Sequence, residues 1–180
     1  MQMYKFFDLK TPGDLLRKLE REYDRWKADP LNVDVAWNFF VTVEHLPDWI
    51  YYQDMPTSGK PRPDLLDGEE PYVFKMALTR PLLRICSHLA NGAKHFHLRN
   101  TNLTSVDRTV IEPRSYVADG YVADGYFAKE PMLVVYLSHD EVAALQQAGV
   151  PVTAEDNEVL WIAARVLEFW QAWLVLHPSS

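Results

Sequence analysis

The stretch HLANGAKHFHL at residues 88–98 gathers side chains that can transfer protons and bind anions. It holds three histidines, one asparagine and one lysine within eleven residues. Histidine titrates near neutral pH, so it can act as a general acid or base. Arg84 lies just upstream and could stabilise the charge of a phosphate group.

Helical spacing places these polar residues along one edge of the helix expected at 81–96. Arg84, His88, Asn91 and His95 follow one another at intervals of four, three and four residues, opposite a continuous apolar face. Such an edge either faces water, as in any amphipathic helix, or forms half of a polar cleft.

A second polar edge is expected on the helix at 34–52. If the two edges meet, they form a ligand-binding cleft that includes Asn38, Thr42, His45, Asp48 and His88. One chemistry for this cleft is acid–base catalysis on a phosphodiester. Another is metal binding, but the Glu-x-x-His pairs of di-iron bundles are missing, so neither a metal nor another cofactor is predicted.

Two segments, AWNFFVTVEHLPDWIYY and LRICSHLANGAKHF, resemble a group of uncharacterised bacterial and phage-associated proteins over about residues 34–97. Within the second segment, ANGAKH is remotely similar to the Arg-Asn-x-x-x-His signature of HEPN domains. These are small helical bundles, often dimeric. Several are metal-independent ribonucleases of toxin or anti-phage systems, and others are only interaction modules.

Asn91 and His95 match the HEPN signature, whereas Ala90 occupies the position of its arginine. The resemblance implies that His95 is the acid–base residue and that Asn91 orients it. Arg84 or Lys94 would then hold the phosphate in place of the signature arginine.

Composition sets limits on the class of protein. The chain has 180 residues, 48% of them hydrophobic, which is enough for one well-buried domain. Its net charge of −7 and its scattered basic residues argue against binding to duplex DNA, although a small RNA site is still compatible. With a single cysteine, Cys86, no intrachain disulfide can form, which is typical of the cytoplasm.

The expected fold is mainly α, a helical bundle with an inserted β-hairpin, or α+β in detail. Helices are predicted at about 12–28, 34–52, 73–96, 139–148 and 154–177, and the hairpin at about 107–137. Residues 73–96 divide into a short helix at 73–78 and a longer one at 81–96. Ser138 and Glu141 predict a capping box, and the repeat YVADGYVADGY predicts a turn or bulge within the hairpin.

The last predicted helix is apolar on nearly all sides, so we expect it at the centre of the bundle or in a homodimer interface. It contains Arg165 and Glu168 and its apolar stretch is shorter than about 20 residues, so we do not expect a membrane span.

One preferred function and two alternatives follow, and the sequence leaves open whether the protein is an enzyme. The preferred one is a cytoplasmic, non-catalytic helical module that binds a ligand or a protein partner. The alternatives are a HEPN-like ribonuclease that uses His95 and a metal-binding helical bundle.

Overall fold

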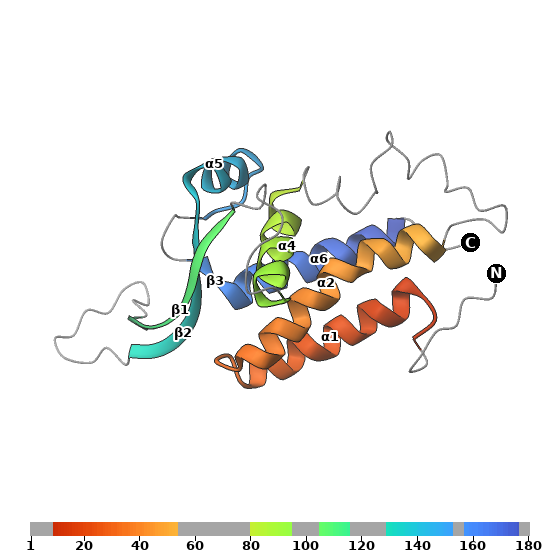
Figure 1. Cartoon of the computed structure of the whole chain (residues 1–180), viewed down its shortest axis with the longest axis horizontal. Coiled ribbons are helices and arrows are strands. Elements are labelled where there is room, and N and C mark those ends of the chain that lie inside the picture. The colour runs from red at the N-terminus through yellow and green to blue at the C-terminus, as the bar shows by residue number, and fades with distance from the viewer. Residues whose placement is uncertain (1–8, 54–79, 95–104, 116–128, 153–156, 177–180) are drawn as a thin grey trace.

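Two long antiparallel helices, α1 and α2, lie side by side in the computed structural model (Figure 1). The structure describes residues 9–53, 80–94, 105–115, 129–152 and 157–176. Helix α1, Pro12–Ala28, begins at a capping box in which the Thr11 Oγ1 accepts from the Asp14 N–H at 3.0 Å. Helix α2, Val33–Gln53, begins after Asn32, whose Oδ1 accepts from the Val35 N–H at 3.1 Å.

Helices α6, Val159–Leu176, and α4, Pro81–Lys94, pack against this pair and complete the bundle (Figure 1). Large aromatic side chains fill the core between them. The Trp26 and Phe40 rings meet edge to face at 5.7 Å, and the Trp170 and Trp173 rings do so at 5.9 Å. Burying side chains of this size stabilises the fold by about 1.5–3 kcal/mol each, which makes these contacts its main support.

A small antiparallel sheet lies at one end of the helices, and helix α5, His139–Gln147, follows its central strand (Figure 1). Strands β1, Val106–Ser115, and β2, Lys129–Leu137, form the hairpin pair, and β3, Asn157–Glu158, adds to the other side of β2. Pro113 lies opposite Pro131 in the β1–β2 register. Because proline has no N–H, these two residues can only form a non-hydrogen-bonded pair.

The predicted fold class is confirmed, since the described chain is mostly helical with a small antiparallel sheet. The helix predicted at 12–28 agrees with α1, and those at 34–52 and 139–148 agree with α2 and α5 to within one residue at each end. Helix α4 begins at Pro81, while 73–79 and 95–96 of the helical region predicted at 73–96 lie outside the described residues, as does the Asp-Gly repeat.

The prediction of a helix over 154–177 is wrong at its beginning. Asn157 and Glu158 pair with Val135 and Val134 of β2, and α6 starts only at Val159. The free edge of β2 offers main-chain hydrogen bonds to these two residues, and this long-range pairing outweighs the local preference for a helix. The sheet therefore has a third strand that the hairpin prediction lacked.

Helix α6 is, among the described helices, the one long and apolar enough to cross a membrane by length and composition. The central helix of a folded core has the same properties. Its inner side chains, among them Ile162, Val166 and Trp170, are buried against the bundle. At its end Val175 and Leu176 are 79% and 75% exposed, and the homodimer prediction depends on this surface.

Candidate functional site

The polar edge of α4 is bound by neighbouring elements along its length. Arg84 donates from Nε to Glu141 Oε2 at 2.6 Å and from Nη2 to Glu141 Oε1 at 2.7 Å. Glu141 is only 3% exposed, so this two-point ion pair joins α4 to α5 in a mostly buried setting. A guanidinium held in this way has its charge neutralised by the protein itself.

The ion pair also changes the predicted capping box of α5. Ser138 Oγ accepts from the Glu141 N–H at 3.4 Å, which is the first half of that motif. The Glu141 carboxylate, however, faces Arg84, and the Ser138 N–H donates instead to the Ser105 carbonyl at 3.0 Å. A cation from a distant part of the chain has therefore replaced the local partner.

His88 joins α4 to the sheet. Its side chain is 7% exposed, and its Nδ1 accepts from the Val106 N–H at 2.9 Å. Because Nδ1 is the acceptor, the proton of the neutral ring is assigned to Nε2. Burial lowers the pKa of His88, and the charges of Asp107 and Glu141 oppose that shift without cancelling it. The ring is thus held neutral as a structural acceptor.

Asn91 contacts α2, but not at the residues predicted to face it. Its Nδ2 donates to Glu44 Oε1 at 2.5 Å and to the Ser87 carbonyl at 2.8 Å. Thr42, the centre of the predicted α2 edge, is buried on the side of α1, where its hydroxyl donates to Glu22 Oε2 at 2.8 Å. Lys18 Nζ reaches the same hydroxyl at 2.6 Å.

The predicted meeting of the Thr42 edge of α2 with Asn91 of α4 is therefore wrong. Residues 42 and 44 lie about 200° apart around a helix, so an edge centred on Thr42 turns away from α4 when Glu44 faces it. Asn38 and His45 are exposed and Asp48 is half-buried. Of the predicted catalytic set, His95 and the Lys94 side chain lie outside the described residues. Within the described part, no three His, Cys, Asp or Glu side chains converge on a metal position.

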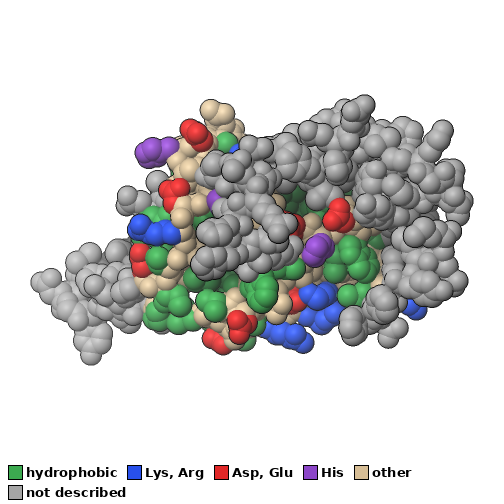
Figure 2. All heavy atoms as spheres, in the orientation of Figure 1, with side chains coloured by type: hydrophobic (Ala, Val, Ile, Leu, Met, Phe, Trp, Pro, Cys, Tyr) green, Lys and Arg blue, Asp and Glu red, His purple; other side chains and the backbone are tan. Residues whose placement is uncertain are grey.

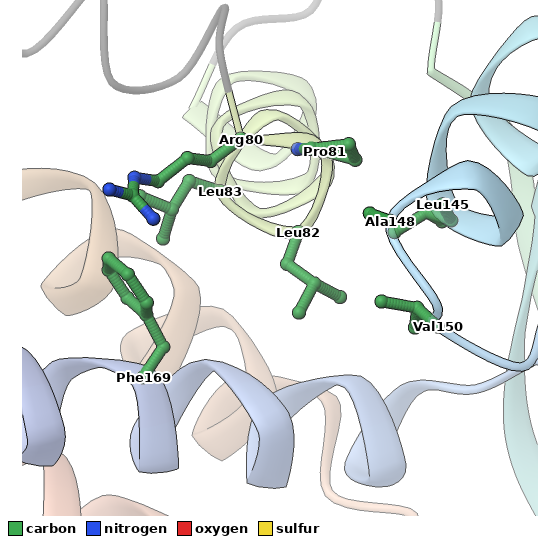
Figure 3. A pocket seen from close by; sticks show the side chains of 8 residues that line it. All are labelled: Arg80, Pro81, Leu82, Leu83, Leu145, Ala148, Val150 and Phe169. Atoms are coloured by element: carbon green, nitrogen blue, oxygen red, sulfur yellow. The ribbon is translucent and has the colours of Figure 1, made fainter.

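An apolar cavity of about 230 Å³ lies instead at the start of α4, between α4, α5 and α6 (Figure 3). Its walls come from three parts of the chain that are distant in sequence. The side chains that line it are those of Arg80, Pro81, Leu82, Leu83, Leu145, Ala148, Val150 and Phe169. Arg80 carries the one charged group among these lining residues.

The α5 wall of the cavity is built by the way that helix ends. Gly149 has φ of +76°, its N–H donates to the Gln146 carbonyl at 3.0 Å, and the Val150 N–H donates to the Leu145 carbonyl at 2.9 Å. These two bonds make a Schellman motif, which reverses the chain and brings the residue after the glycine back against the last turn. Val150 and Leu145 consequently share one apolar wall.

On the α4–α6 side, the Arg80 guanidinium lies over the Phe169 ring, 4.8 Å from its centroid (Figure 3). Arg80 is exposed, and within the described residues it forms no ion pair with a carboxylate. The cavity therefore has a cationic group on one side and only apolar side chains on the other.

Sequence reasoning missed this cavity, although one signal for it was present. Gly149 predicts the end of α5, and the end of α5 forms one wall. Nothing local indicates that Phe169 meets Arg80, because the two residues are brought together by the packing of α6 on α4.

Comparison of the chain with models of known protein families, with curated proteins and with solved structures found no match. The geometry of the described residues is therefore what any functional argument depends on. On the face of the molecule shown in Figure 2, the described residues present acidic and basic side chains interspersed with hydrophobic ones.

Proposed function

We propose that the protein is a non-catalytic binding module that holds a small, largely apolar ligand in the cavity between α4, α5 and α6. The observation that carries this proposal is a contrast along one helix. The polar side chains of α4 that could do chemistry are used in contacts between elements, while the start of the same helix borders an open apolar cavity.

The HEPN-like nuclease is the weaker proposal because of what Arg84 and Asn91 contact. Arg84 makes two hydrogen bonds to the buried Glu141 carboxylate, and Asn91 donates to the Glu44 carboxylate. Binding a phosphate at Arg84 would leave Glu141 buried without its counter-charge, which is energetically costly. A metal-binding bundle has no converging set of ligands among the described residues to support it.

The size and lining of the cavity define the ligand class. A cavity of about 150 Å³ lined by apolar side chains can bind benzene. At about 230 Å³, the cavity beside α4 has room for one ring and a short chain. At roughly 0.3 kcal/mol per heavy atom, a probe of about eleven heavy atoms would bind with a dissociation constant in the low-millimolar range or tighter.

A titration with 3-phenylpropionamide, a neutral probe of this size, tests the proposal. We expect ¹H–¹⁵N NMR shifts that saturate and that cluster at Leu82, Leu83, Leu145 and Val150, which line the cavity. Ala148→Phe should remove binding by filling the cavity, because Ala148 lines it and is exposed enough to accept a larger side chain.

The matched control is Ala143→Phe, at an exposed position within α5 that does not line the cavity. This variant should bind the probe as the wild type does. Absence of saturable shifts in the wild type, or unchanged binding by Ala148→Phe, would reject the proposed function.

A further inference from the structure

We infer that the ligand of this cavity is a small monocarboxylate, with its carboxylate at Arg80 and its apolar body against Leu145 and Val150. The inference rests on the binding function proposed above and adds the chemical class of the ligand. It depends on the state of one guanidinium and on the asymmetry of the cavity that it borders.

The contact that positions Arg80 leaves its hydrogen-bond donors free for a ligand. The guanidinium lies 4.8 Å from the Phe169 ring centroid, and a cation–π contact uses none of the five N–H donors of arginine. The ring restrains the side chain beside the cavity, which reduces the entropy lost when an anion binds.

The charge around Arg80 is uncompensated in the described part of the chain. Arg84, four residues further along the same helix, is paired with Glu141, whereas Arg80 has no carboxylate partner there. Arg80 also precedes the first turn of α4, where the helix dipole places partial positive charge. Both features favour an anion at this end of the cavity, in a chain whose net charge is −7.

The opposite side of the cavity is suited to a hydrocarbon group. Leu145, Ala148 and Val150 line it, and Leu82 points between them and α6 (Figure 3). A ligand with one charged end would thus bind in one orientation. A single guanidinium matches a single negative charge, and its fork of N–H groups matches the two oxygens of a carboxylate.

A pair of probes that differ in one group tests this inference. We would measure the affinities of 3-phenylpropionate and 3-phenylpropionamide for the full chain by NMR titration at pH 7.5 and low salt. Because Arg80 is exposed, the expected preference for the carboxylate is modest, about threefold to fivefold. In Arg80→Gln the two dissociation constants should become equal.

The control variant is Arg165→Gln. Arg165 also lies over an aromatic ring, 5.8 Å from the Trp161 centroid, but it does not line the cavity. This variant should keep the wild-type preference, which separates a local role of Arg80 from a general effect of removing one positive charge.

The outcomes separate the carboxylate preference from the binding function of the cavity. Equal affinity of the wild type for both probes, or a preference that survives Arg80→Gln, overturns the carboxylate inference and leaves the binding cavity standing. Failure of both probes to bind overturns the inference together with the proposed function.

Discussion

Two arginines at the start of helix α4, Arg80 and Arg84, are one turn apart but differ in what they contact. Arg84 is bound at two points by the buried Glu141 carboxylate, and the polar residues after it are bound to β1 and α2. Arg80 lies over Phe169 beside an open apolar cavity. The comparison teaches that a group of catalytic residue types can be structural, while the available site can lie among mostly apolar residues.

The largest expected effect comes from breaking the Arg84–Glu141 ion pair between α4 and α5. Arg84→Met leaves the Glu141 carboxylate, 3% exposed, buried without a counter-charge. We expect this change to lower the free energy of unfolding by about 3 kcal/mol, measured by urea denaturation at pH 7. Arg84→Met combined with Glu141→Leu should recover much of the loss, because no buried charge then remains.

An exposed ion pair provides the control for that experiment. Arg165 and Glu168 are 47% and 56% exposed, so Arg165→Met should cost less than about 1 kcal/mol. Equal destabilisation of the Arg84 and Arg165 variants would contradict the structural role of the buried Arg84–Glu141 pair.

His88 makes the stability of the folded protein depend on pH. Burial lowers the pKa of His88 in the folded protein, so as the pH falls the unfolded chain takes up its proton first. The His88 contribution to stability is therefore complete above about pH 6.5 and is lost as the pH falls through the lowered, folded-state pKa.

Comparing the wild type with His88→Asn isolates this contribution, since the asparagine Oδ1 can still accept from the Val106 N–H without titrating. Between pH 7 and 5, the free energy of unfolding of the wild type should fall more steeply, by at most about 1.4 kcal/mol per pH unit. Parallel pH profiles for the two proteins would mean that His88 is not held neutral by the fold.

Gly149 tests whether the α5 wall of the cavity depends on the Schellman motif that ends this helix. At φ of +76° an alanine is strained, so Gly149→Ala should cost about 1 kcal/mol and should weaken binding of 3-phenylpropionamide by displacing Val150. Chemical denaturation and NMR titration would measure the two effects. A variant as stable as the wild type would contradict the Schellman geometry.

Gly92 is the glycine to compare with it, and the smallest effect is expected there. It lies inside α4, and a Cβ added at that position meets nothing within 4 Å. Gly92→Ala should therefore stabilise the protein by about 0.5–1 kcal/mol, the reverse sign of the change at Gly149. A loss of stability would indicate a close approach to the backbone at Gly92.

Local signals predicted much of the fold. Thr11 as a helix cap, the Pro12 that follows it and the periodicity of the apolar residues all act within a few residues of the chain, so the bounds of α1 could be predicted closely. The strand at Asn157–Glu158 could not, because it exists only where β2 presents a free edge.

The site was less predictable for the same reason. A helical wheel shows which residues share an edge, but not which neighbour that edge meets. Asn91 does contact α2, yet through Glu44, while Thr42 contacts α1. Arg84, a candidate for binding phosphate, instead pairs with Glu141, which lies 57 residues away in sequence, and so has a structural role.

The most direct test of this account is an NMR map of where 3-phenylpropionate binds the full chain. The account predicts saturable shifts at Leu82, Leu83, Leu145 and Val150, around the cavity, and unchanged resonances at Glu44, His88 and Asn91. Shifts centred on Glu44, His88 and Asn91 instead would contradict it, because the polar edge of α4 would then be the binding site.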